Sequence, residues 1–168
     1  MVLVVMGVSG SGKTTVATAL AGLLGWDFQE GDDLHPEVNR QKMAAGIALT
    51  DDDRWPWLDR IADWISAKLH ARQSGIVTCS ALRQCYRDRL AADGVVFVFL
   101  HGSRQLIDDR LSRRAGHFMP ESLLDSQLRT LEAPSEGKNT VVVELGGTPE
   151  EEAAHALKAL RRKGLVPG

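Results

Sequence analysis

Hydrophobic and polar residues alternate along this chain in blocks that predict strands and helices in turn. Continuous apolar runs, several of them rich in valine, are typical of strands that helices cover on both faces. Between them, apolar residues recur three and four positions apart, which predicts helices. The predicted strands are residues 2–6, 26–29, 75–79, 95–100 and 140–145. The predicted helices are residues 14–24, 36–45, 54–72, 83–92, 103–113, 120–131 and 149–162.

This alternation of strand and helix predicts an α/β fold with a parallel, doubly wound sheet. Two helix starts carry signals of their own. Thr50 with Asp53 three residues later resembles a capping pair, and Thr148 precedes a proline and several acids. No internal repeat, low-complexity segment or linker divides the chain, so we expect residues 1–168 to form a single domain.

A glycine-rich segment joins the first predicted strand to the first predicted helix. It reads G-x-x-x-x-G-K-T, the phosphate-binding P-loop. Its glycines let backbone N–H groups wrap around phosphate oxygens, and the helix N-terminus adds the positive end of a dipole. Lys13 supplies a cation for the β- and γ-phosphates, and the Thr14 hydroxyl is the expected Mg²⁺ ligand. The residues expected to hold ATP here are Gly7, Ser9, Gly10, Ser11, Gly12, Lys13, Thr14 and Thr15.

Composition narrows the class of protein further. Apolar residues make up 43% and charged residues 25%, as in ordinary globular proteins, and the net charge of −2 gives no bulk attraction for nucleic acid or anionic membranes. No apolar stretch approaches the roughly 20 residues that span a bilayer. The first strand starts within two residues of Met1 and no basic segment precedes it, so we expect no signal peptide. Two cysteines are too few for a disulfide framework, and we expect a cytoplasmic protein.

Two acidic residues, Glu30 and Asp32, follow the second predicted strand. The carboxyl ends of neighbouring parallel strands share one crevice, so both are expected to face the nucleotide. Asp32 is the expected base that accepts the proton of an acceptor hydroxyl, and Glu30 would orient metal-bound water. Acids here are also typical of turns and caps, which is our interpretation of Asp33. The third strand ends in Cys79 and Ser80 without a Walker B acid, which disfavours a motor ATPase.

Basic residues complete the predicted crevice. Arg54 follows three acids, and Arg83 follows the third predicted strand. If these side chains point into the crevice, their planar guanidinium groups can each bind a carboxylate with two hydrogen bonds. The acids at 51–53 are interpreted as an ion-pair cluster at a helix start. His35 and His117 are each equally suited to hydrogen-bond a polyol hydroxyl or to play a local structural part.

The segment around residues 110–120 concentrates three arginines, Arg110, Arg113 and Arg114, before a glycine and a proline. An arginine-rich helix pair with such an interruption is what a mobile lid over phosphates requires. Arginine is also favourable near any helix C-terminus. In a P-loop protein we favour the lid, at about residues 110–131.

Four blocks of sequence cover most of the chain. They are GVSGSGKTT (7–15), EGDDLHPEVNRQKMAAGIALTDDDRWPWL (30–58), CSALRQCYRDRL (79–90) and LHGSRQLIDDRLSRRAGHFMPESLLDSQLRTLEAP (100–134). In these blocks the chain resembles the gluconokinases, small P-loop kinases that phosphorylate D-gluconate with ATP. The last three blocks are far more specific than the P-loop. After residue 134 the acidic pair usual in the family is missing, which we expect to alter only local contacts.

The resemblance implies a fold like that of nucleoside monophosphate kinases, with a five-stranded parallel sheet, a mobile helical lid and a homodimeric assembly. The catalytic residues it implies are Lys13, Asp32, Arg113 and Arg114. The gluconate-binding residues it implies are Asp32, His35, Lys42, Arg54, Arg83 and His117. Beyond the P-loop, the ATP-binding residues are Arg110, against adenine, and Thr148, in the adenine-side loop at 146–149. The metal-site residues are Thr14 and Glu30.

The activity that the resemblance implies is transfer of a phosphoryl group from ATP to the 6-hydroxyl of D-gluconate, giving 6-phospho-D-gluconate and ADP. Two alternatives remain. The same scaffold suits a shikimate or nucleoside monophosphate kinase, and a catalytically silent nucleotide-binding regulator is the second alternative. The presence of Lys13, Thr14 and Asp32 argues against the regulator, and an acceptor panel distinguishes all three.

Overall fold

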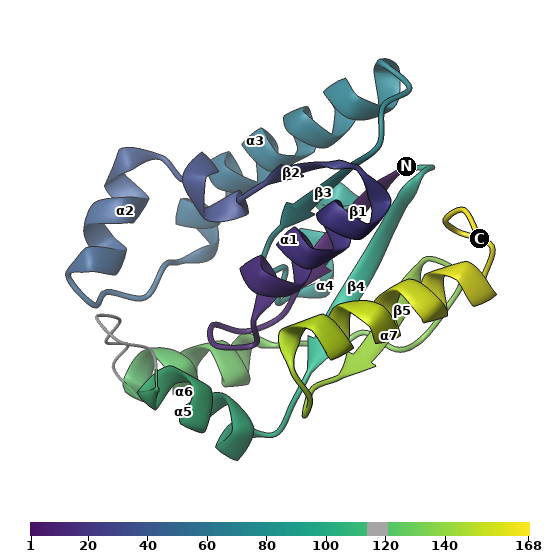
Figure 1. Cartoon of the computed structure of the whole chain (residues 1–168). Coiled ribbons are helices and arrows are strands. Elements are labelled where there is room, and N and C mark those ends of the chain that lie inside the picture. The colour runs from purple at the N-terminus through teal and green to yellow at the C-terminus, as the bar shows by residue number, and fades with distance from the viewer. Residues whose placement is uncertain (114–120) are drawn as a thin grey trace.

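A five-stranded parallel sheet forms the centre of the computed structural model, which describes residues 1–113 and 121–168 (Figure 1). The strand order is β2-β3-β1-β4-β5, and every neighbouring pair is parallel. The predicted α/β fold with its five-stranded parallel sheet is thereby confirmed. The strands are β1 (Val2–Met6), β2 (Asp27–Gln29), β3 (Gly75–Thr78), β4 (Val95–His101) and β5 (Thr140–Glu144).

Helices connect the strands at the positions that the apolar periodicity predicts, with ends within three residues of the expected ones. The capping pair of Thr50 and Asp53 is confirmed: the Thr50 hydroxyl accepts from the Asp53 N–H at 3.2 Å, and the Asp53 carboxylate accepts from the Thr50 N–H at 2.9 Å. The helices are α1 (Lys13–Leu24), α2 (Glu37–Ala44), α3 (Asp51–His70), α4 (Gln84–Leu90), α5 (Arg104–Ser112), α6 (Glu121–Thr130) and α7 (Pro149–Arg162), with a 3₁₀ turn, η1 (Gly31–Leu34).

Two hydrophobic cores lie on opposite faces of the sheet. Leu3 and Val5 of β1 belong to the core that includes α1 and α7, whereas Val2 and Val4 belong to the core that includes α3 and α4. All residues of β1 are fully buried, because successive side chains point to opposite faces and both faces are covered. The continuous apolar run in the sequence therefore marks the strand that carries the P-loop at its end.

A third, smaller core fixes the P-loop to the helices beyond β4. Val8 packs with Leu82, with Ile107 of α5 and with Leu124 of α6, and all four are buried. At Gly10, which has a φ of 84°, an added Cβ would lie only 2.7 Å from the Leu111 side chain, so only glycine fits. The P-loop thus rests on α5 and α6, and α6 lies within the segment expected to form the lid.

Arg114 and His117, for which the sequence predicts roles in the site, lie outside the described residues, and the mobility of the lid stays a prediction. Within the described ranges, none of the helices is long and apolar enough to cross a membrane.

Candidate active site

The P-loop folds around its own lysine at the carboxyl edge of the sheet. Lys13 Nζ donates to the carbonyl oxygens of Gly7 at 2.9 Å and Val8 at 3.2 Å. Gly12 takes a φ of 86° immediately before α1, which turns the chain into the helix without a Cβ clash. This arrangement brings a cation, glycine-flanked N–H groups and a helix N-terminus to one place, as a polyphosphate requires.

A carboxylate from β2's end lies beside the P-loop threonine. The Thr14 hydroxyl donates to Glu30 Oε2 at 2.5 Å, and the Thr78 hydroxyl donates to Glu30 Oε1 at 2.5 Å. Thr78 also accepts from the Gly31 N–H at 2.9 Å, so the last residue of β3 fixes the chain at the end of β2. Sequence reasoning missed Thr78, although a hydroxyl at the end of an apolar buried strand was a visible signal.

These oxygen donors fit a hard cation such as Mg²⁺. In the described ranges no group of three or more His, Cys, Asp or Glu side chains is placed to hold a metal by itself. An ion would therefore rely on Thr14, on the phosphates of the nucleotide and on water, with Glu30 placed to orient that water. That Thr14 and Glu30 serve a metal ion stays a prediction.

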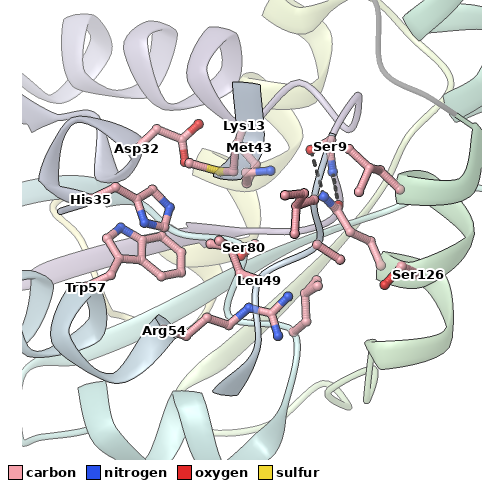
Figure 2. A pocket seen from close by; sticks show the side chains of 15 residues that line it. Ser9, Lys13, Asp32, His35, Met43, Leu49, Arg54, Trp57, Ser80 and Ser126 are labelled. Carbon is pink, nitrogen blue, oxygen red and sulfur yellow. Dashed lines mark hydrogen bonds between the residues drawn. The ribbon is translucent and has the colours of Figure 1, made fainter. Parts of the chain in front are cut away.

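A cavity of about 270 Å³ opens beside Lys13 (Figure 2). It gathers Asp32, His35 and Arg54 from the segment between β2 and β3, so three of the predicted acceptor residues share one space with the P-loop lysine. Part of its wall is apolar, which suits the carbon chain of a small polyol. The residues that line it are Ser9, Lys13, Asp32, His35, Met43, Ile47, Ala48, Leu49, Arg54, Trp57, Ser80, Leu82, Leu123, Ser126 and Gln127.

His35 is held as a neutral hydrogen-bond donor. It is 5% exposed and stacks on Trp57 with ring centroids 4.1 Å apart. Asn39 Nδ2 donates to the Asp53 carbonyl at 2.8 Å and also lies 3.2 Å from His35 Nδ1. Because a carbonyl needs a donor, the amide nitrogen faces the ring, Nδ1 accepts and the proton is on Nε2. Burial, then the charges of two nearby arginines, lower the pKa of His35 to about 4.

The turn that carries Asp32 is pinned from two sides. The Trp57 indole N–H donates to the Gly31 carbonyl at 2.8 Å, and the Gly31 N–H donates to Thr78. Gly31 approaches β3 so closely that an ideal Cβ would lie 1.7 Å from the Thr78 carbonyl oxygen. Asp32 is therefore presented to the cavity by a buried, doubly anchored backbone.

The predicted gluconate residues Lys42 and Arg83 are not among those that line this cavity. Lys42 Nζ donates to both carboxylate oxygens of Asp53, at 2.8 and 2.9 Å, and this bond is the main cause that lowers the pKa of Asp53 to about 2. Arg83 pairs with Asp51 and lies 3.5 Å from Glu132, beside a neighbouring hollow of about 400 Å³ that Arg54 also lines. Their contact with gluconate stays a prediction.

Gln127 of α6 is a further residue that sequence reasoning missed. Its Oε1 accepts from the Ser9 N–H at 2.8 Å, and its Nε2 donates to the Ser9 hydroxyl at 3.1 Å. It also lines the cavity beside Lys13, so one side chain contacts the P-loop and borders that cavity. The partners lie 118 residues apart, and no local pattern marks such a pair.

A separate hollow of about 290 Å³ lies between the P-loop, Arg110 and the start of α7. Arg110 lines it, donating to the Ser11 carbonyl at 3.3 Å and to Glu152 Oε1 at 2.6 Å. Glu152 is 1% exposed, and its Oε2 has no hydrogen-bond partner within the described residues. An amino or hydroxyl group of a nucleotide would satisfy this oxygen, so the hollow fits ATP.

Two more of the predicted residues lie at helix ends. Thr148 caps α7 by accepting from the Glu151 N–H at 3.1 Å, which confirms the predicted helix start, and its contact with ATP stays a prediction. Arg113 follows α5 and is exposed.

Comparison with known proteins finds several related chains. Residues 2–134 match the family model described as AAA domain. A gluconokinase from Gluconobacter oxydans is 53% identical over 143 residues, which are 84% of this chain and 80% of that protein. The solved structure of a gluconokinase from Sinorhizobium meliloti is 50% identical, with a TM-score of 0.87 over 95% of this chain and 91% of that one. A sugar kinase structure from Janibacter is 45% identical, with a TM-score of 0.88 over 99% of this chain and 98% of that one.

Proposed function

Because the chain belongs to the gluconokinase family, we propose that it transfers the γ-phosphoryl group of ATP to the 6-hydroxyl of D-gluconate. The products are 6-phospho-D-gluconate and ADP. The observation that carries the proposal is the single cavity that Lys13, Asp32 and Arg54 line together. It combines a cation for phosphate, a carboxylate base and a guanidinium for the acceptor's carboxylate.

The chemistry at the transferring phosphoryl group uses two side chains. Asp32 accepts the proton of the 6-hydroxyl while the hydroxyl oxygen forms a bond to the γ-phosphorus. The bond between the γ-phosphorus and the β–γ bridging oxygen breaks, and ADP leaves with that oxygen. Lys13 stabilises the negative charge on the phosphoryl oxygens. Bound Mg²⁺, held through Thr14 with water oriented by Glu30, would supply further charge neutralisation.

Acceptor recognition falls to the rest of the cavity. Arg54 grips the carboxylate of gluconate with two hydrogen bonds. The neutral His35 donates from Nε2 to a hydroxyl of the polyol, and Trp57 holds its ring in place. Catalysis then rests mainly on positioning and on charge stabilisation.

The lid is part of the proposal. Arg113 and Arg114, with His117, would close over the phosphates and exclude water that otherwise attacks ATP. Arg110 and Thr148 would complete the adenine side.

The test is a coupled ADP-release assay with Mg-ATP against D-gluconate, shikimate, AMP and no acceptor. Turnover with gluconate alone supports the proposal. Turnover with shikimate or AMP would keep the nucleotide site and refute the acceptor assignment. ATP binding without turnover on any acceptor would favour the regulator. A second run with EDTA in place of Mg²⁺ should lose activity.

We also propose a homodimer, as the family resemblance implies, and a cytoplasmic location, as the composition and the two cysteines lead us to expect. Light scattering on the purified protein measures the mass directly, and a mass of one chain would refute the dimer.

A further inference from the structure

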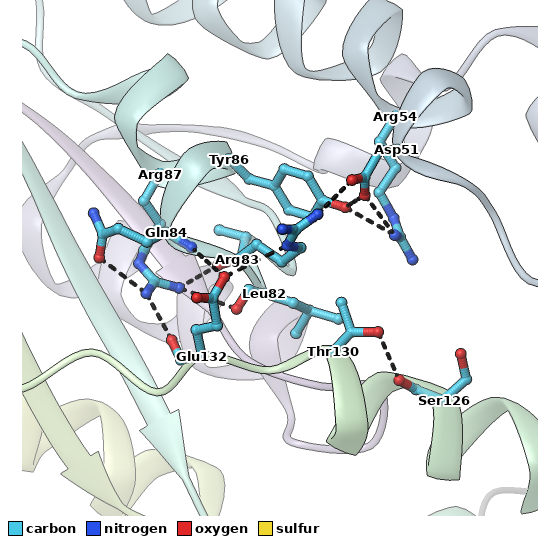
Figure 3. A network of polar contacts seen from close by, with 11 residues as sticks. Asp51, Arg54, Leu82, Arg83, Gln84, Tyr86, Arg87, Ser126, Thr130 and Glu132 are labelled. Atoms are coloured by element: carbon cyan, nitrogen blue, oxygen red, sulfur yellow. Dashed lines mark hydrogen bonds and ion pairs between the residues drawn. The ribbon is translucent and has the colours of Figure 1, made fainter.

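Arg54 of α3 contacts a buried tyrosine, Tyr86 (Figure 3). Its guanidinium Nη1 donates to the hydroxyl of Tyr86 at 3.0 Å, and its central carbon lies 5.5 Å from the centre of the same ring. Tyr86, on α4, is 1% exposed and does not line the cavity, whereas Arg54 is among the residues that line it. Arg54 therefore links the buried Tyr86 hydroxyl to the cavity.

The proton of this hydroxyl has a fixed direction. Tyr86 donates it to Asp51, because a guanidinium has no acceptor to offer. Its oxygen lone pairs are thereby left to accept from Arg54. Burial, then the hydrogen bond to Asp51, raises the pKa of Tyr86, which keeps the phenol protonated.

Asp51 pairs with both arginines, but more closely with Arg83 than with Arg54. Its nearer oxygen is 3.8 Å from Arg54, while its other oxygen accepts directly from Arg83. The hydrogen bond from Tyr86, followed by contacts with Arg83, lowers the pKa of Asp51, so the carboxylate stays ionised and is paired chiefly with Arg83. This gives Arg83 a part in the network that does not require contact with the acceptor.

Holding a guanidinium in place matters because the free arginine side chain has many rotamers. Ordering such a side chain when a ligand arrives reduces affinity, whereas a side chain ordered by the fold incurs no such cost on binding. A bidentate grip on a carboxylate also demands one orientation of the guanidinium plane.

We propose that Tyr86, oriented by Asp51, is a positioning residue that sets the orientation of Arg54 and thereby the affinity for the acceptor's carboxylate. The inference rests on the proposed function, since it takes gluconate as the acceptor. It assigns no contact between Tyr86 and the acceptor or the nucleotide.

Tyr86→Phe tests this, because it keeps the ring and removes only the hydroxyl. We expect the KM for gluconate to rise about tenfold, with kcat and the KM for ATP within about twofold of wild type, since a correctly bound acceptor still reacts normally. Asp88→Asn is the matched control: it alters an exposed hydrogen bond of α4 outside this network and should change none of these constants.

A double-mutant cycle separates positioning from a general structural effect. In an Arg54→Gln background, Tyr86→Phe should leave kcat/KM for gluconate unchanged, because no guanidinium remains to orient. An additive loss there, or equal rises in KM for gluconate and ATP, would overturn the inference. So would an unchanged KM in the single variant. If wild type itself fails to phosphorylate gluconate, the proposed function fails first, which distinguishes the two.

Discussion

Replacing Gly31 by alanine should damage both stability and turnover, because this residue of η1 lies directly against the backbone at the end of β3. An ideal Cβ would stand 1.7 Å from the carbonyl oxygen and 2.8 Å from the carbonyl carbon of Thr78. Both are backbone atoms, so no change of rotamer relieves the overlap. The two segments must separate by roughly 1 Å or more, and displacements of that size near the chemistry can cost about 10² in rate.

The energetic cost follows from the contacts that such a separation disturbs. Overpacking a buried site costs about 1–3 kcal/mol. Two buried hydrogen bonds of Gly31, from its N–H to Thr78 at 2.9 Å and from Trp57 to its carbonyl at 2.8 Å, are stretched as well. With about 1 kcal/mol or more for each, we expect the free energy of unfolding to fall by about 3–5 kcal/mol. Since Glu30 and Asp32 flank Gly31, we expect kcat to fall about 100-fold.

Urea unfolding followed by tryptophan fluorescence, together with the ADP-release assay, measures both effects. Gly22→Ala is the matched control, because nothing lies within 4 Å of the added Cβ on the exposed side of α1. It should stabilise the protein by up to about 1 kcal/mol and leave kcat unchanged. A Gly31→Ala protein within about 1 kcal/mol of wild type and with normal kcat would refute the close approach of Gly31 to Thr78.

Three further predictions concern the site. Asp32→Asn should lower kcat with gluconate by about 10²–10⁴ while ATP still binds, and a normal kcat would remove Asp32 as the base. Gln127→Ala loses both hydrogen bonds to Ser9 and should lower kcat/KM for ATP about tenfold, the equivalent of about 1.4 kcal/mol; an unchanged value would show that the P-loop keeps its shape alone. The pKa of His35 falls to about 4 in the folded chain against 6.5 in a free histidine, so only the unfolded state takes up this proton as the pH drops from about 6.5 towards 4. Its contribution to stability is therefore complete above pH 6.5 and declines below it, and urea unfolding of His35→Gln should show a shallower decline than wild type.

The fold was predictable from the sequence because its signals are local. The apolar runs of β1 and β4, and the spacing of apolar residues in α3, follow from which faces of these elements are buried. Thr50 and Asp53 indicate a helix start within four residues. The P-loop was visible for the same reason.

What could not be predicted depends on side chains that meet from distant parts of the chain. Tyr86 and Arg54 are 32 residues apart in the sequence, and Gln127 and Ser9 are 118 residues apart. No local sequence pattern indicates that either pair is in contact. Arg83 shows the same limit for a residue that the sequence did single out. Its residue type suits a carboxylate, and the carboxylates it finds are those of the protein itself, Asp51 and Glu132.

The position of β2 at the edge of the sheet has a consequence for how such a protein can diverge. Asp32, His35, Arg54 and Trp57 all belong to one uninterrupted connection between this edge strand and β3. An edge strand has a neighbour on one side only, so a longer or shorter connection there leaves the pairing of β1, β4 and β5 intact. Exchange of a single contiguous stretch of the gene would therefore replace these four cavity side chains at once, while the P-loop is left unaltered.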